Sequence, residues 1–334
     1  MEYGLSVFGH HDVEKPPDEN FRTVVEQVRT ARDVGFDYII AGHHYVMEER
    51  QKFQVMPAMS RLAADAGEMR VGMFLLLPLH HPVEIAEQYA TLDAITGGRT
   101  IFAPVMGYRD KEFEAFGISK RDQRGRFVES IEVIKRLWTE DSVSYDGEHF
   151  AFEDVTITPK PMQDPRPPIW IGANRDAAVK TASEIGDAWF VNPHDTEEVL
   201  AEQLAMIDEP QGEGYHGLQP MAKPAFVAPT DEEALRIYGP QLEAFFEWYE
   251  KVGQGEAMET PEAIDLSETG LDRFLIGSPE TVARKIVRLE SELGIDSLTV
   301  SMHKIGIDTA DVQRSIELFG EEVVPRVEER LSSG

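Results

Sequence analysis

Short apolar segments alternate with amphipathic ones along the chain, and residues 70–117 show this pattern most clearly. Residues 71–77 form an almost continuous apolar run, which is typical of a strand buried on both faces of a parallel sheet. Apolar residues then recur every three to four positions between Pro82 and Gly97-Gly98, which are ordinary helix boundaries. Residues 100–104 form a second apolar run. The stretch predicts a strand–helix–strand unit, with a loop over residues 105–117.

The alternation continues to the end of the chain and predicts eight strands, most of them followed by a helix. Residues 143–161 interrupt it with the turn signal Asp146-Gly147, which predicts a β-hairpin insertion. Residues 258–270 show no period and predict a loop that could belong to a lid. The pattern favours one α/β domain over residues 1–334, a (β/α)8 TIM barrel with insertions. A doubly wound open sheet is the alternative, although no G-x-G-x-x-G follows the first strand. Predicted strands are 3–8, 38–41, 71–77, 100–104, 168–172, 188–191, 222–227 and 297–301, and predicted helices are 20–34, 57–66, 82–96, 121–137, 174–185, 278–294 and segments starting at 195, 231 and 309.

Several short motifs fall at the boundaries of these elements: Leu79-His80-His81-Pro82, Leu92-Asp93-x-x-Thr96-Gly97-Gly98-Arg99, Gly107-Tyr108-Arg109-x-x-Glu112-Phe113, Leu137-Trp138-Thr139-Glu140 and Gly277-Ser278-Pro279-Glu280. In type and order they resemble the luciferase-like monooxygenase family, which contains bacterial luciferase and other flavin- or deazaflavin-dependent oxidoreductases. The resemblance implies a TIM barrel, an oxidoreductase activity on a small molecule and, commonly, a homodimer. It also implies a flavin reductase as a partner if the cofactor is reduced FMN.

Charge is the unusual feature of the composition. The chain has 61 Asp and Glu against 32 Lys and Arg, a formal net charge of −29, which argues against nucleic-acid binding. It has no cysteine, no apolar run long enough to span a membrane and no secretory signal, so a cytoplasmic protein is expected. The acidic excess is spread along the chain, and only 11 of the basic residues are lysines. This favours a protein adapted to high salt over an ordinary acidic one, because salt screens the self-repulsion of the surface.

We therefore expect the thermal stability of the protein to rise steeply between low and molar KCl. A series of thermal melts over that range tests the prediction, and an unchanged midpoint would remove the halophile interpretation.

Most histidines lie at the carboxyl ends of predicted strands, where ligands bind in such folds. Eight of the ten follow a predicted strand directly, and a barrel brings these strand ends to one mouth. We expect a neutral-to-cationic pocket for a planar, anionic cofactor. Alternatives are a metal site, which lacks the usual helical histidine pairs and recurring carboxylates, and ordinary polar loops. The eight are His10, His11, His43, His44, His80, His81, His194 and His303.

The resemblance makes His44 the expected catalytic residue. Family members usually have Gly-Glu-His-His after the second strand, with the first histidine near the reactive edge of the flavin, and this chain has Gly42-His43-His44-Tyr45. An imidazole titrates near neutral pH and therefore suits proton transfer. A loop histidine bound to backbone is the alternative. The residues expected to contact substrate are Phe8, His10, Tyr108 and His194.

The remaining candidates concern the cofactor. Val105-Met106-Gly107 stands where bacterial luciferase has Cys-Arg-Gly, so Met106 and Gly107 are expected at the cofactor but without that arginine. The phosphate is expected at the helix start Gly172-Ala173-Asn174-Arg175, because free N–H groups and the helix dipole attract anions there. Arg124 and Arg126 are further phosphate candidates, or else surface residues paired with acids. Met73, Phe74 and Leu75 are expected to form the apolar wall or core, with Phe74–Leu75 as the candidate for the cis peptide that the family often has.

Three functions remain open at this level. The first is a monooxygenase or oxidoreductase that uses reduced FMN, the second an oxidoreductase that transfers hydride with F420, and the third a non-catalytic flavin-binding barrel. FMN is favoured over F420, because the anionic F420 tail needs a basic groove and only scattered basic residues are expected near the mouth. These are Arg109, Lys111, Arg124, Arg126 and Arg175.

Overall fold

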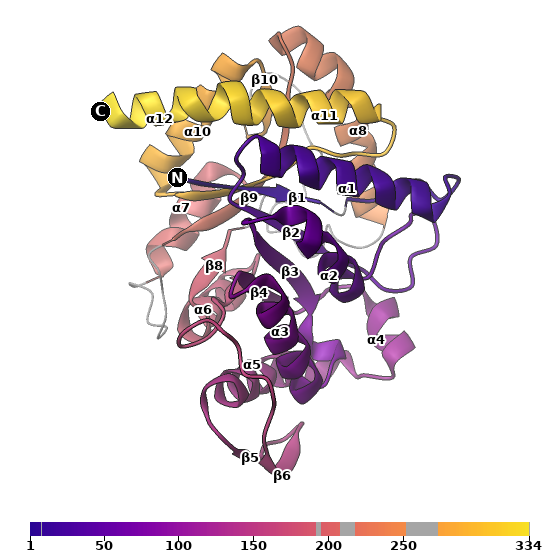
Figure 1. The fold of residues 1–334 in the computed structure, drawn as a ribbon, viewed down its shortest axis with the longest axis vertical. Coiled ribbons are helices and arrows are strands. Elements are labelled where there is room, and N and C mark those ends of the chain that lie inside the picture. The colour runs from indigo at the N-terminus through magenta and orange to yellow at the C-terminus, as the bar shows by residue number, and fades with distance from the viewer. Residues whose placement is uncertain (8, 192–194, 208–217, 252–272, 334) are drawn as a thin grey trace.

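A curled sheet of parallel strands forms the centre of the molecule, with helices packed around its outer face (Figure 1). The structure is a computed structural model that describes residues 1–7, 9–191, 195–207, 218–251 and 273–333. Within this part, nine strands follow the order β10-β9-β11-β1-β2-β3-β4-β7-β8, and all their pairings are parallel. The strands are β1 (Glu2–Ser6), β2 (Tyr38–Gly42), β3 (Arg70–Leu76), β4 (Thr100–Val105), β7 (Trp170–Gly172), β8 (Ala188–Phe190), β9 (Pro220–Val227), β10 (Leu275–Gly277) and β11 (Ser297–Ser301).

The sheet curls far enough for its last strand to approach the other side. A bridge between Val191, next to β8, and Met221 of β9 joins these two segments, which are distant in the strand order. The predicted α/β architecture of parallel strands and outer helices is therefore confirmed. The regular eightfold repeat is not, because β10 pairs with the end of β9 as a ninth strand. The sequence analysis missed β10 because it has only three residues.

Helices fall close to their predicted positions. The short helix α4 is an exception, because it lies inside the segment 105–117 that was predicted to be a loop. The predicted hairpin is present as the antiparallel pair β5 (Val143–Asp146) and β6 (Ala151–Val155). No described helix has the length and apolarity that a membrane crossing requires. The helices are α1 (Pro17–Asp33), α2 (Val55–Ala66), α3 (Pro82–Thr96), α4 (Asp110–Phe116), α5 (Gln123–Thr139), α6 (Asp176–Ile185), α7 (Glu197–Met206), α8 (Asp231–Lys251), α10 (Pro279–Leu293), α11 (Thr309–Leu318) and α12 (Val324–Ser333).

Asp93 belongs to the motif at the end of α3, residues 92–99, and connects it to the neighbouring segments. Its buried carboxylate accepts hydrogen bonds from the Thr100 hydroxyl at 2.6 Å, the Met162 amide at 2.7 Å and the Gln163 side chain at 2.7 Å. Gly97 ends the helix in the left-handed region, with φ of 68°, where a side chain would be strained. The motif thus fixes the start of β4 and the segment that returns from the hairpin.

The two faces of the sheet are covered by different sets of buried side chains. Alternate residues such as Ile39, Met73 and Phe102 pack against the helices, in the large core that also contains the helix side chains. The intervening residues form a separate cluster without helix side chains, which therefore lies on the concave face of the sheet. This cluster fills the inside of the sheet. Its buried members are Tyr38, Ile40, Ile101, Ala103, Trp170, Ala188 and Phe190.

Candidate active site

A cavity of about 530 Å³ lies at the carboxyl ends of the strands, where the sequence predicted a ligand site. This volume falls in the range of small-molecule and cofactor pockets. No carboxylate is among the described residues that line it, although acidic residues outnumber basic ones almost two to one in the chain. The wall instead carries four cationic side chains, Arg50, Lys52, Lys223 and Lys304, and four histidines. The cavity is therefore suited to an anionic ligand.

The strand-end histidines divide into two groups. His10, His43, His44 and His303 line the cavity, as expected. His11, His80 and His81 do not line it: His11 packs against Phe53, His80 bonds to Tyr45, and the His81 side chain caps the start of α3. His194 and Phe8, both expected at the substrate, lie outside the described residues. All eight strand-end histidines were expected to line one pocket, and four of the seven that the structure describes do so.

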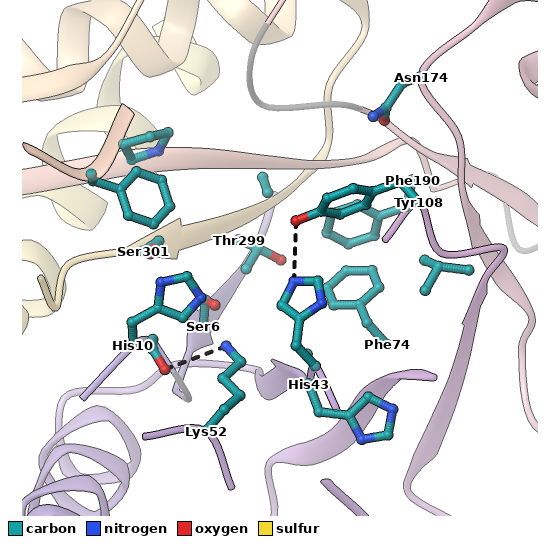
Figure 2. Close-up of a pocket in the computed structure, with 18 of the residues that line it drawn as sticks. Ser6, His10, His43, Lys52, Phe74, Tyr108, Asn174, Phe190, Thr299 and Ser301 are labelled. Atoms are coloured by element: carbon teal, nitrogen blue, oxygen red, sulfur yellow. Dashed lines mark hydrogen bonds between the residues drawn. The ribbon is translucent and has the colours of Figure 1, made fainter. Parts of the chain in front are cut away.

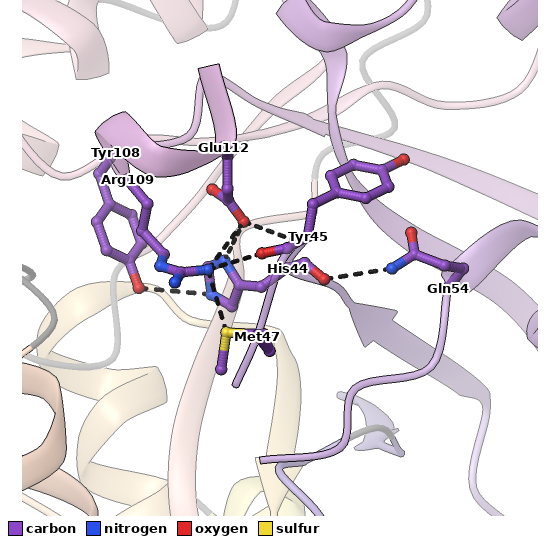
Figure 3. A network of polar contacts seen from close by, with 7 residues as sticks. All are labelled: His44, Tyr45, Met47, Gln54, Tyr108, Arg109 and Glu112. Atoms are coloured by element: carbon purple, nitrogen blue, oxygen red, sulfur yellow. Dashed lines mark hydrogen bonds and ion pairs between the residues drawn. The ribbon is translucent and has the colours of Figure 1, made fainter. Parts of the chain in front are cut away.

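His44 is held by a buried carboxylate, Glu112 (Figure 3). Its Nδ1 lies 3.0 Å from Glu112 Oε1, which also accepts the backbone N–H of Tyr45 at 2.8 Å and lies 3.4 Å from an Arg109 nitrogen. Glu112 comes from α4, the helix that the sequence analysis missed, and is 0% exposed. The Tyr108 hydroxyl lies 3.4 Å from the other imidazole nitrogen, Nε2. His44 therefore has one nitrogen fixed and the other directed towards the cavity.

The electrostatics of His44 favour a neutral imidazole. Burial lowers its pKa below the usual value of 6.5, and the Glu112 carboxylate opposes the shift. In the neutral form, Nδ1–H donates to Glu112 and Nε2 keeps its lone pair. Glu112 would also stabilise the imidazolium that forms when Nε2 takes up a proton. The pair thus has the arrangement of a base and the group that orients it.

Aromatic side chains form one wall of the cavity (Figure 2). Phe74 and Phe190 meet edge to face, with ring centroids 4.7 Å apart, and Tyr108 lies beside them. Of the three wall candidates in β3, only Phe74 lines the cavity. Met73 and Leu75 are buried in the core on the opposite face, since strand side chains alternate. The cis peptide expected at Phe74–Leu75 is also absent, because the cis bonds of the described chain precede Pro159 and Pro165.

A second wall is made by the turn after β7. Gly172, Ala173 and Asn174 line the cavity, whereas Arg175 precedes α6 and does not line it. A side chain at Gly172 would meet Val105 at 2.9 Å, so glycine permits the close approach of this turn. The carbonyl groups of Ala173 and Asn174 accept hydrogen bonds from Trp189 and Gln203, which lie outside the cavity wall. The N–H groups at the start of α6 remain a potential anion site.

Two phosphate candidates lie away from the cavity wall. Arg124 is exposed and reaches the Thr181 hydroxyl at 3.4 Å. Arg126 donates to the backbone carbonyl of Pro78 at 2.8 Å and lies over the ring of Phe150. Both belong to the first turn of α5 (Gln123–Thr139), the helix start that made them phosphate candidates. By contrast, Met106 and Gly107 line the cavity where they were expected.

The sequence analysis missed the lysines of the cavity. Lys52 lies in the loop between β2 and α2, and Lys304 follows β11. Burial lowers the pKa of each ammonium group to about 7. Lys304 lies three residues after a predicted strand, which was an available signal, whereas Lys52 lies ten residues after β2 and gave none.

A curled parallel sheet with a cavity at the carboxyl ends of its strands defines a TIM-barrel-like protein with a ligand site in the usual place. The comparison with known families identifies it further: the chain belongs to the luciferase-like monooxygenase family, whose model matches residues 1–297. The expectation drawn from the short motifs is confirmed.

Relatives in this family use two cofactors. The chain is 29% identical over 320 residues to an FMNH2-dependent dimethylsulfone monooxygenase of Pseudomonas putida, covering 88% of this chain and 85% of that protein. It is 26% identical over 333 residues to an F420-dependent glucose-6-phosphate dehydrogenase of Microbacterium testaceum, covering 90% of this chain and 92% of that protein. Among solved structures, the monooxygenase RslO1 of Streptomyces bottropensis has a TM-score of 0.86 at 22% identity, covering 97% and 99%. The last comparison concerns the fold alone.

Proposed function

We propose that the protein is a flavin-dependent monooxygenase that uses reduced FMN and oxygen on a small organic substrate. One observation carries the proposal: in the wall of the cavity lies His44, which the buried carboxylate of Glu112 orients from behind. The dimethylsulfone monooxygenase, with 29% identity over most of both chains, supports the choice of cofactor.

The residues of the cavity fit such a cofactor. The phosphate would lie at Gly172, Ala173 and Asn174, against the N-terminus of α6, with Arg175 close by in sequence. The ring system would lie on the aromatic wall formed by Phe74 and Phe190. Met106 and Gly107 would close the same side of the cavity. When bound, reduced FMN supplies the electrons that activate oxygen.

His44 would transfer a proton in this reaction. Its neutral imidazole can take up a proton at Nε2, and Glu112 would hold the ring in that orientation and stabilise the cation. Tyr108 would contact Nε2 through its hydroxyl and face the substrate, together with His10. The polar groups thus act at one end of an otherwise apolar wall.

An F420-dependent hydride transfer is the second candidate function. The F420-dependent dehydrogenase of Microbacterium testaceum aligns over 92% of its own length, and the cationic wall could also accept an anionic deazaflavin. A third function, a non-catalytic barrel, has no use for the orientation of His44 by a fully buried carboxylate. We further propose a single cytoplasmic barrel domain that assembles as a homodimer, receives FMNH2 from a reductase and tolerates high salt.

Titration of the purified protein with FMN, reduced FMN and F420 tests the proposal. We expect reduced FMN to bind most tightly, because the neutral-to-cationic cavity suits the anionic phosphate and the reduced ring. Micromolar binding of F420 without detectable FMN binding would move the function to hydride transfer. If none of the three binds, the protein is not an enzyme of either kind.

A further inference from the structure

Three hydroxyl side chains line the cavity where β1 and its neighbour β11 end. They are Ser6 of β1 and Thr299 and Ser301 of β11. The two strands are parallel with Gly4 opposite Thr299, and continuing this register places Ser6 opposite Ser301. Because strand side chains alternate between the two faces, all three hydroxyl groups belong to the concave face. We call the pair of Ser6 and Ser301 the hydroxyl subsite.

A buried hydrogen-bond chain lies next to the hydroxyl subsite, towards the amino ends of the strands. The Tyr38 hydroxyl lies 2.8 Å from the Thr299 hydroxyl and 3.0 Å from that of Ser297. Tyr38 belongs to β2 and reaches β11 across β1, where a Cβ atom at Gly4 would lie 2.0 Å from the Tyr38 ring. Thr299 is 1% exposed and Ser297 is 0% exposed. The chain thus uses the Thr299 hydroxyl within the protein and leaves the hydroxyl subsite as the part open to a ligand.

The two serines of the subsite keep hydrogen-bonding capacity for a ligand. Each hydroxyl has one O–H donor and two acceptor lone pairs. The Ser6 hydroxyl has no hydrogen-bond partner among the described residues, and its side chain is partly exposed at the cavity. Ser301 accepts a hydrogen bond from the Lys304 ammonium group at 3.2 Å, which leaves its own O–H to donate and polarises it. Two O–H donors are therefore available at neighbouring positions of the wall.

The hydroxyl subsite lies apart from the turn at which the phosphate is expected. Strands β2, β3 and β4 separate β1 from β7 in the sheet. In Figure 2, Thr299 lies between His10 on one side and the aromatic side chains of Phe74 and Tyr108 on the other, and Asn174 lies beyond the aromatic side chains. A flavin with its phosphate at that turn and its ring on the aromatic wall would therefore leave the subsite for a second molecule.

We propose that the hydroxyl subsite binds the carbonyl oxygen of an uncharged organic substrate. Ser6 and Ser301 donate to the two lone pairs of this one oxygen, which is possible because opposite residues of neighbouring strands lie about 5 Å apart. Neutral donors suit a neutral acceptor, since no ion has to lose its hydration on binding. The apolar remainder of the substrate lies towards Phe74 and Tyr108. The inference rests on the proposed function only in naming the carbonyl compound as the substrate.

Titrations of the full-length protein at pH 7, followed by NMR signals of the ligand, test the subsite. The probes are cyclohexanone and methylenecyclohexane, in which a CH2 group replaces the carbonyl oxygen. Ser6→Ala and Ser301→Ala should each weaken cyclohexanone binding by about two- to tenfold, the loss of one hydrogen bond between uncharged groups. Both variants should leave the affinity for methylenecyclohexane unchanged. Each probe is compared only between variants, so the different hydrophobicity of the two probes does not enter.

Ser297→Ala is the matched control variant. It removes a hydroxyl from the same strand and the same face, but Ser297 is fully buried and does not line the cavity. Both affinities should stay at their wild-type values, because the Tyr38 hydroxyl keeps Thr299 as its partner. Thermal melts without ligand check folding. Ser6→Ala should melt at the wild-type temperature, since it breaks no hydrogen bond within the described part of the chain.

The same titrations with saturating FMN distinguish a substrate site from a cofactor site. Cyclohexanone should bind with and without FMN and depend on both serines in each case. Displacement of cyclohexanone by FMN, or weaker FMN binding by the two alanine variants, overturns the proposal, because the hydroxyls then belong to the cofactor site.

The remaining outcomes separate this inference from the proposed function. Equal effects of the alanine variants on both probes, no effect on either probe, or binding of neither probe by the wild type also overturns the subsite. If neither FMN nor F420 binds while cyclohexanone binding still depends on Ser6 and Ser301, the hydroxyl subsite stands and the proposed redox function fails.

Discussion

His44→Ala is expected to lower turnover by about 10²- to 10⁴-fold, the loss expected when a group that transfers a proton is removed. The variant should keep an FMN affinity close to that of the wild type. The separation of effects follows from the geometry. His44 presents Nε2 to the cavity next to Tyr108, whereas the expected phosphate site lies at the turn after β7. Steady-state kinetics at saturating substrate and a flavin titration measure the two quantities. Wild-type turnover in the variant would reduce His44 to a structural loop residue.

The pH profile of kcat/KM gives an independent check on the same residue. The pKa of His44 is lowered by burial, so the reactive neutral imidazole predominates at pH 7, and activity should fall as the pH falls through a value below 6.5. Glu112→Gln removes a charge that raises this pKa and should therefore move the acidic limb to lower pH. The limb should vanish in the residual activity of His44→Ala. A limb unmoved by Glu112→Gln would contradict the pairing of these two side chains.

Helices and strands were predicted correctly where several local sequence signals indicated the same element boundaries. Pro82 and Gly97 bound α3 as predicted, and β11 begins and ends at its predicted residues. The misses have physical causes. β10 has three residues and α4 has seven, so both elements are too short to show a periodic pattern of apolar residues in the sequence. Both are stabilised by packing rather than by their own propensity.

The site was harder to predict because contacts distant in sequence create it. His44 could be found from its motif, but its partner Glu112 is 68 residues away on an unforeseen helix. Met73 and Leu75 show a related difficulty, because a short apolar strand does not reveal which of its faces is turned to the cavity. Lys52 and Lys304 come from loops that are distant in the sequence, and only the folded chain shows that both line the cavity.

The second large effect concerns stability, and it is expected for Asp187→Leu. Asp187 precedes β8 and is 2% exposed, and its carboxylate accepts two hydrogen bonds from Arg166, at 2.5 and 2.8 Å. It also accepts the backbone N–H of Ile169 at 2.7 Å, so it joins the starts of β7 and β8. Removing the carboxylate leaves a buried guanidinium without its counter-charge, and the free energy of unfolding should fall by about 3–5 kcal/mol. Urea unfolding at pH 7 measures the change.

Two further variants show whether burial causes this loss. Glu140→Ala breaks the exposed pair with Arg136 on α5, in which the side chains are 34% and 44% exposed, and it should cost no more than about 1 kcal/mol because water screens the pair. Arg166→Met combined with Asp187→Leu removes both buried charges and should recover part of the lost stability. A deficit of about 1–3 kcal/mol should remain, since the Ile169 N–H loses its acceptor. If Asp187→Leu cost no more than Glu140→Ala, the ion pair would not be the buried clamp that aligns β7, and with it the turn at Gly172, against β8.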